Sequence, residues 1–288
     1  FVGAGYIGGK WFEAAKYGLM FGMVQMFASL GSAVSQPAIS AMLEHMSWEQ
    51  LLAGFGTFGV LLTLAFIFIV RNPVSPPAAS TAPSERKGLM SEIMGDLGTC
   101  FRNWQVNLSA LFAGASFGTM LAVGVLWGPR VQEARGASAG FAAVLSALAW
   151  LGLAFGAPLV NVVSNRYHSR KWPAVVGIVL QTVAVTLFIY GPNDAAGASA
   201  VVMFAVGLFA GTHMLGFTIA GESVEGGLIG SASAIVNGVC FIVGGILEAV
   251  PGYLLSDNPD LDDYKKSLWI MPVVLGLGAL AALALKER

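Results

Sequence analysis

Charged residues and cysteines are scarce in this 288-residue sequence. Asp, Glu, Lys and Arg make up 11% of the chain, whereas an average soluble domain contains about 25%. A chain with so few charges cannot cover its folded surface with polar groups, but a chain in lipid does not need to. The two cysteines, Cys100 and Cys240, imply no disulfide framework. The net charge of −1 offers no basic face to a nucleic acid.

Catalytic and metal-binding clusters are also missing. The three histidines, His45, His168 and His213, lie in different segments, and no His or Cys pair has metal-ligand spacing. Gly3, Gly5 and Gly8 match the spacing of a dinucleotide-binding loop. No acid follows about 20 residues later, however, as that site requires. We therefore expect no metal, no cofactor and no enzymatic activity.

Long apolar segments are what the sequence has in abundance. Hydrophobic residues make up 56% of the chain, and the mean hydropathy is +0.73. A membrane-spanning helix needs about 20 mostly apolar residues. Windows of that length predict eight spans, at residues 18–43, 50–70, 105–127, 139–163, 172–190, 197–220, 230–255 and 267–285. Residues 1–9 look like the stub of another. The predicted fold is an all-α integral membrane protein, a polytopic helical bundle.

One long polar segment lies between the second and third spans, and its composition is typical of a linker. Cytoplasmic loops of membrane proteins carry an excess of Lys and Arg, which indicates the orientation. With alternating spans, eleven of the 15 basic residues fall on the side of the linker. The other four, Arg130, Arg135, Lys265 and Lys266, fall on the opposite side. We predict that the linker and the C-terminus are cytoplasmic.

Polar side chains recur at helical spacing inside three of the apolar spans. They are Gln25, Ser29, Ser32 and Gln36 in the first span, Ser109 and Ser116 in the third, and Asn237 in the seventh. Small hydroxyls often do no more than bond a neighbouring helix. Amide side chains are costly against lipid and tend to face a cavity or a partner helix. We predict that these residues line an aqueous solute pathway.

Two titratable residues also lie within predicted spans. Glu248 projects about 20° from Asn237 on the same helix, and a charge at a helix centre costs about 2.5–3.5 kcal/mol on insertion scales. Glu248 is either a site of proton or charge coupling or a residue that reaches the outer interface. His213 is either a coupling residue or a packed, hydrogen-bonded side chain.

Several stretches resemble the major facilitator superfamily, whose members have two six-helix halves joined by a long cytoplasmic linker. The stretch 10–18 is similar to the loop between that family's fourth and fifth helices, and Trp48-Glu49 and 71–73 resemble the bounds of its sixth. The stretch 164–171 resembles the family's basic signature loop. That loop contributes Asn165, Arg166, Arg170 and Lys171, with Asn165 in place of the usual acid and His168 in place of the usual glycine.

The resemblance implies an organisation for the whole chain. Residues 1–72 would be the end of the N-terminal half, with a stub and two helices, and the first three to four helices would be absent. Residues 73–104 would be the cytoplasmic linker, and residues 105–288 the C-terminal six-helix half. The protein would lie in a bacterial inner membrane.

The same resemblance implies secondary active transport by alternating access. The stretch 222–252 is similar to permeases for organic anions and small metabolites, so such a solute is expected, with or without a co-transported ion. Drug efflux is disfavoured because Ser35-Gln36-Pro37 stands where that subgroup has Gly-Pro. A membrane-embedded enzyme and a non-transporting membrane subunit are the alternative classes. The expected partners are the lipid bilayer and a small solute.

Overall fold

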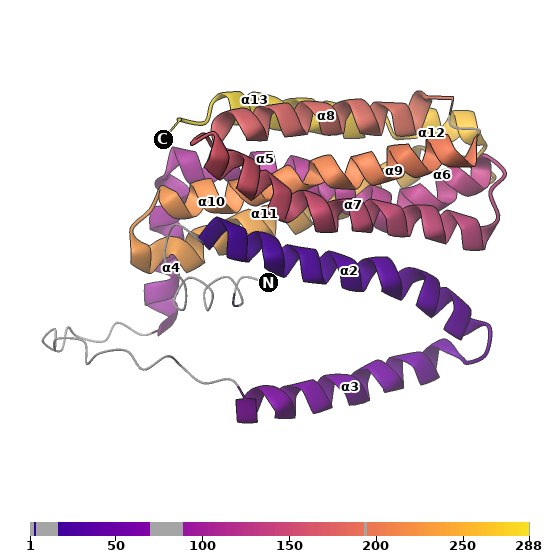
Figure 1. Cartoon of the computed structure of the whole chain (residues 1–288), viewed down its shortest axis with the longest axis horizontal. Coiled ribbons are helices and arrows are strands. Elements are labelled where there is room, and N and C mark those ends of the chain that lie inside the picture. The colour runs from indigo at the N-terminus through magenta and orange to yellow at the C-terminus, as the bar shows by residue number, and fades with distance from the viewer. Residues whose placement is uncertain (1–2, 4–16, 70–88, 193–194, 288) are drawn as a thin grey trace, which may run out of the picture.

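The structure is a computed structural model that describes residues 3, 17–69, 89–192 and 195–287. Within those residues the regular structure is entirely helical (Figure 1). The elements are α2 (Tyr17–Leu43), α3 (Trp48–Ile69), α4 (Leu89–Arg102), α5 (Trp104–Ala122), η2 (Val123–Trp127), α6 (Gly128–Ala134), α7 (Ala139–Arg166), α8 (Lys171–Tyr190), α9 (Ala196–Ala210), η3 (Gly211–His213), α10 (Met214–Glu222), η4 (Gly226–Leu228), α11 (Ile229–Ala249), η5 (Val250–Leu254), α12 (Leu261–Ser267) and α13 (Ile270–Leu283).

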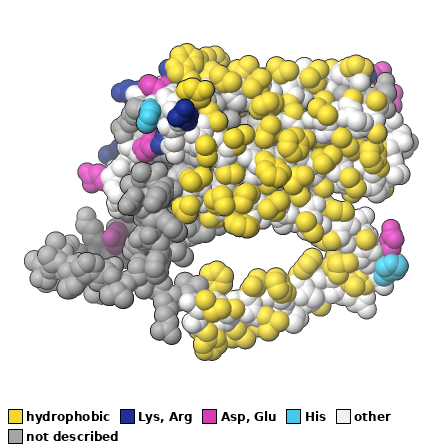
Figure 2. All heavy atoms as spheres, in the orientation of Figure 1, with side chains coloured by type: hydrophobic (Ala, Val, Ile, Leu, Met, Phe, Trp, Pro, Cys, Tyr) yellow, Lys and Arg dark blue, Asp and Glu magenta, His cyan; other side chains and the backbone are white. Residues whose placement is uncertain are grey.

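The predicted all-helical membrane fold is confirmed. Eight of the described helical segments are long and apolar enough to cross a membrane. A broad hydrophobic belt covers the visible face of the bundle, with charged side chains gathered at its two ends (Figure 2). The predicted stub at 1–9, apart from residue 3, and the linker residues 73–88 lie outside the described residues.

The third span is longer than predicted. It was expected to end at residue 127, but the helical segment runs from Trp104 to Ala134. The extension begins with a π-helical turn, η2, and continues through Pro129 into α6. Because proline has no N–H group, Pro129 cannot continue the backbone hydrogen bonds of η2. The apolar run of the sequence ends at this π-helical turn, whereas the helical backbone continues past it.

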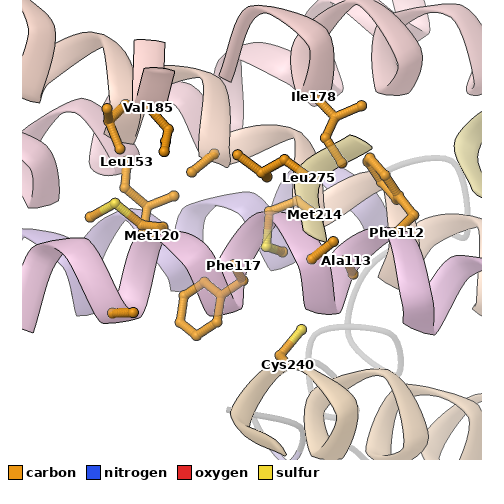
Figure 3. Packing of buried hydrophobic residues seen from close by; sticks show 14 of the residues in the cluster. Phe112, Ala113, Phe117, Met120, Leu153, Ile178, Val185, Met214, Cys240 and Leu275 are labelled. Atoms are coloured by element: carbon orange, nitrogen blue, oxygen red, sulfur yellow. The ribbon is translucent and has the colours of Figure 1, made fainter. Parts of the chain in front are cut away.

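Helix α5 occupies the centre of the bundle. It is the most buried of the spans, and its neighbours are α10, α11 and α13. Figure 3 shows its residues Phe112, Phe117 and Met120 among side chains from the surrounding helices. Helix α2 lies along α7, while α3 stands apart from the bundle and buries only Leu51 (Figure 1).

Helix α4 is a short helix that precedes the third span. It packs against α11 and buries Cys100, whose Sγ lies 3.9 Å from the Leu228 carbonyl oxygen. Burial, with a smaller effect of Asp96, raises the pKa of the Cys100 thiol. Since the thiolate is the reactive form, this cysteine is expected to react slowly.

Four glycines let α7 and α9 approach closely. Gly152 and Gly156 of α7 lie against the backbone of α9, Gly207 of α9 lies against the backbone of α7, and Gly211 of η3 lies against Gly156. A Cβ atom at Gly207 would overlap the carbonyl oxygen of Ala149. Small residues at such contacts are typical of membrane helices, whose association depends on packing rather than on expulsion of water.

We expect Gly207→Ala to destabilise the protein by about 1–3 kcal/mol, the usual cost of forcing extra volume into a packed core. The matched control is Gly276→Ala on α13, where a Cβ atom would meet nothing within 4 Å. Thermal unfolding of the purified protein in detergent measures both. Equal melting temperatures for the two variants would contradict the close contact between α7 and α9.

Candidate functional site

A cavity of about 230 Å³ lies between five helices of the bundle. Its walls are Gln25, Ala28 and Ser32 from α2, Phe117 and Leu121 from α5, Trp150 from α7, His213 and Phe217 from η3 and α10, and Asn237, Cys240 and Phe241 from α11. Ligand pockets usually measure about 300–1,000 Å³. This cavity lies just below that range and suits a compact solute.

Amide groups on opposite walls supply hydrogen-bonding capacity. The Gln25 Nε2 donates to the buried Ser29 Oγ at 3.0 Å, which fixes the orientation of the Gln25 side chain. Across the cavity, the half-buried Asn237 side chain has no hydrogen-bond partner among the described residues. Its amide can both donate and accept, so a solute in the cavity can satisfy it.

His213 closes another part of the cavity wall. Its Nδ1 lies 2.8 Å from the Ala210 carbonyl oxygen. Because a carbonyl oxygen only accepts, Nδ1 must carry the proton, which leaves Nε2 of the neutral ring as an acceptor. The ring is buried and lies 4.8 Å from the Phe117 ring, centroid to centroid. It is thus both packed and hydrogen-bonded, while it also lines the cavity.

No side chain that lines the cavity from the described part of the chain carries a full charge. Glu248 is half-buried on α11, eleven residues after Asn237, and is not among the lining residues. The two residues share a face in projection, yet eleven residues rise about 16 Å along a helix. The face of α11 that carries Asn237 and Glu248 therefore extends well beyond the cavity.

The other predicted pathway residues lie in packed surroundings. Ser116 is fully buried and donates to the Gln181 Oε1 at 2.6 Å, and the Gln181 Nε2 donates back to the Ser116 carbonyl oxygen. Ser109 is also fully buried. Gln36 donates to the Gly124 carbonyl oxygen at 3.0 Å and does not line the cavity.

The predicted signature loop joins α7 to α8 and is organised around Arg170. The guanidinium contacts the Asn165 Oδ1 at 2.6 Å and forms an ion pair with Glu222 at 3.0 Å. Glu222 ends α10, so a carboxylate from another helix pairs with this arginine. Arg166 is exposed in the last turn of α7, and Lys171 begins α8.

His168 occupies the position where the resemblance expects glycine, and its φ angle is +50°. This is the left-handed region that glycine enters without a steric penalty and other residues enter rarely. The backbone of the loop therefore keeps the conformation that a glycine would favour, although the residue has changed.

Sequence reasoning missed the aromatic part of the cavity. Phe217 and Phe241 lie four residues after His213 and Asn237, so each shares a helical face with a polar residue that was selected. The same periodicity could have found them. Trp150 had no such signal, because α7 carries no other lining residue.

The helices and the cavity define a class of protein: a polytopic membrane protein with a small, partly open cavity between its helices, lined mainly by apolar and aromatic side chains and by a few polar ones. The sequence profile of the Major Facilitator Superfamily matches residues 1–247. The chain belongs to the Major Facilitator Superfamily, a family of membrane transporters rather than enzymes.

Two curated relatives are similar over nearly the whole chain. A probable sulfoacetate transporter, SauU, of Cupriavidus necator is 25% identical over 95% of this chain and 66% of its own length. A probable L-galactonate transporter of Escherichia coli K12 is 24% identical over 96% of this chain and 64% of its own length. The chain thus spans about two thirds of the length of these relatives.

The placement of Ser116 leads to a test of its packing role. We expect Ser116→Ala to cost about 1–3 kcal/mol, because it leaves the buried Gln181 amide without its donor. The double variant Ser116→Ala/Gln181→Leu should cost less than the sum of the two single changes, since neither partner then remains unpaired. Melting temperatures of the four proteins measure this coupling. Strict additivity would show that the hydrogen bond does not form.

Proposed function

We propose that the protein is a secondary active transporter that carries a small organic anion by alternating access. The observation that carries this proposal is the cavity, where amide, hydroxyl and imidazole groups from α2, η3 and α11 converge inside the hydrophobic belt. Polar groups at that depth are costly and usually mark a substrate path. Transporters of this type bind solutes near the membrane midplane between helices.

The size and chemistry of the cavity support a compact, oxygen-rich solute. Both relatives are described as probable transporters of small acids, sulfoacetate and L-galactonate. The N–H groups of Gln25 and Asn237 suit carboxylate, sulfonate or hydroxyl oxygens. The rings of Phe117, Trp150 and Phe241 suit the carbon skeleton of such a solute.

We further propose residues 1–72, 73–104 and 105–288 as the end of the first half, the linker and the second half of the transporter. The loop of Arg166, Arg170 and Lys171 would face the cytoplasm of a bacterial inner membrane. Glu248 is the candidate for proton coupling, and its distance from the cavity requires it to act separately from solute contacts. The Glu248→Gln variant tests this role through the pH profile of uptake.

We expect Asn237→Leu to weaken solute uptake about tenfold, because it replaces the hydrogen-bonding amide with an apolar side chain of similar size. The matched control is Ile242→Val on the same helix, where the side chain is 62% exposed. Cells expressing the native protein are assayed with labelled sulfoacetate, galactonate and related acids. Uptake that rises above background for none of these acids would contradict the proposed solute class.

The orientation predicts opposite accessibility for two exposed loop positions. Tyr167 follows α7, and Ser256 precedes α12. In intact cells, an impermeant maleimide should label Ser256→Cys and not Tyr167→Cys, with both native cysteines replaced by alanine. In inside-out vesicles the pattern should reverse. Labelling of both positions from one side would contradict the span assignment.

A further inference from the structure

Two helix irregularities face each other one turn beyond the polar wall of the cavity. In α2, Ser32 lines the cavity and Gln36 follows one turn later, directly before Pro37. In the facing segment, Leu121 lines the cavity and the π-helical turn η2 begins at Val123. The Gln36 Nε2 donates to the Gly124 carbonyl oxygen at 3.0 Å and joins the two.

The π turn explains why that carbonyl oxygen is available. The Gly128 N–H group, which would serve Gly124 in an α-helix, bonds to the Val123 carbonyl oxygen instead. The next backbone donor in the π register would be residue 129, which is proline and has no N–H group. The Gly124 carbonyl oxygen therefore has no helical partner, inside a segment where lipid provides none.

A second donor holds the same oxygen from the cavity side. The Trp150 Nε1 lies 3.3 Å from the Gly124 carbonyl oxygen, and Trp150 also lines the cavity. A Cβ atom on residue 124 would lie 3.1 Å from that nitrogen. A glycine at this position thus allows the indole its close approach. One carbonyl oxygen accepts from both a cavity residue and α2.

The contacts of α2 differ between its two ends. At the beginning of α2, a Cβ atom on Gly18 or Gly22 would lie less than 3 Å from atoms of α7, so the helices are in close contact. After Pro37, every side chain from Ala38 to Leu43 except Ile39 is exposed. Pro37 also removes one hydrogen bond of the helix. The far end of α2 therefore packs little against the other described residues, and Pro37 gives the helix a point of bending.

We propose that Gln36 and Gly124 form a latch that keeps the outer end of α2 closed over the cavity, with Trp150 as the residue that positions the Gly124 carbonyl group. Breaking one hydrogen bond releases α2 beyond Pro37 while the tight contact at Gly18 and Gly22 remains. The latch lies on the outer side of the membrane in the orientation proposed above. The latch itself does not depend on the identity of the solute.

The native Cys240 is a reporter for this latch, since it lines the cavity and is only 1% exposed. In a Cys100→Ala background, we expect Gln36→Met to raise the labelling rate of Cys240 by an impermeant maleimide roughly three- to tenfold. That range corresponds to the loss of one net hydrogen bond. Trp150→Phe, which removes the N–H donor of a second helix together with part of the indole ring, should raise the rate in the same direction. Ser40→Ala, one turn further along α2 and exposed, should leave it unchanged.

Labelling is measured in right-side-out and inside-out vesicles. It is normalised to the amount of folded protein, so that low expression is not mistaken for a closed cavity. A rise on the outer side alone supports the proposal. An unchanged rate in both Gln36→Met and Trp150→Phe, or a rise on the inner side alone, would overturn it. Solute uptake is measured separately. Absent uptake with latch-dependent labelling would contradict the proposed function and leave the latch standing.

Discussion

In the lipid core a backbone group that loses its helical partner finds no water to replace it, and much of this structure follows from that constraint. The α-helical pattern is interrupted at η2 and at the 3₁₀ turn η3, and Pro37 removes one hydrogen bond within the continuous helix α2. At η2 and η3, side chains or neighbouring backbone satisfy the freed carbonyl groups. The Gly124 oxygen accepts from Gln36 and Trp150, and the Ala210 oxygen accepts from the His213 Nδ1. The segment η2 is thereby joined to α2 and to α7 by polar contacts.

The cavity lies between two of these interruptions, and this position has a physical cause. At η2 and next to η3, the carbonyl oxygens of Gly124 and Ala210 are within hydrogen-bond distance of ring nitrogens in the cavity wall. Those oxygens fix the Trp150 and His213 rings in the cavity wall. Close glycine contacts between α7, α2 and α9 hold the surrounding backbone. The lining thus consists of oriented groups set in a packed frame, which is what selective binding of a small solute requires.

The number of spans and the helical class could be predicted from hydropathy, because a span of about 20 apolar residues has few alternatives. Gln25, Ser32, Asn237 and His213 could be selected because polar residues are conspicuous in such spans, and all four line the cavity. The register of η2 could not be predicted. Its cause, the arrangement of Gly124, Gly128 and Pro129, becomes visible only when the hydrogen bonds are known.

The spacing of polar residues along a helix also could not distinguish a residue that lines the cavity from one that forms a polar contact with a neighbouring helix. Ser116 and Asn237 both interrupt an apolar helix, yet Ser116 meets Gln181 of α8 while Asn237 meets the cavity. The difference depends on which helix lies opposite, and a single helix does not contain that information. Likewise, Glu248 shares a helical face with Asn237 but lies beyond the cavity along the axis. A projection down the helix axis shows the angle between two residues but not their separation along the axis.

The described residues that line the cavity carry no full charge, and for the proposed organic anion this matters because a carrier must release what it binds. A full ion pair at 4 Å in a medium of effective dielectric constant about 20 contributes about 4 kcal/mol. That would slow dissociation by roughly a thousandfold. Amide N–H groups such as those of Gln25 and Asn237 supply directional but weaker bonds to carboxylate or sulfonate oxygens. Such bonds discriminate between solutes by the positions of their oxygen atoms without making the binding too tight for release. In such a site, the ease with which α2 opens and closes would govern the rate of exchange more than the strength of any single solute contact.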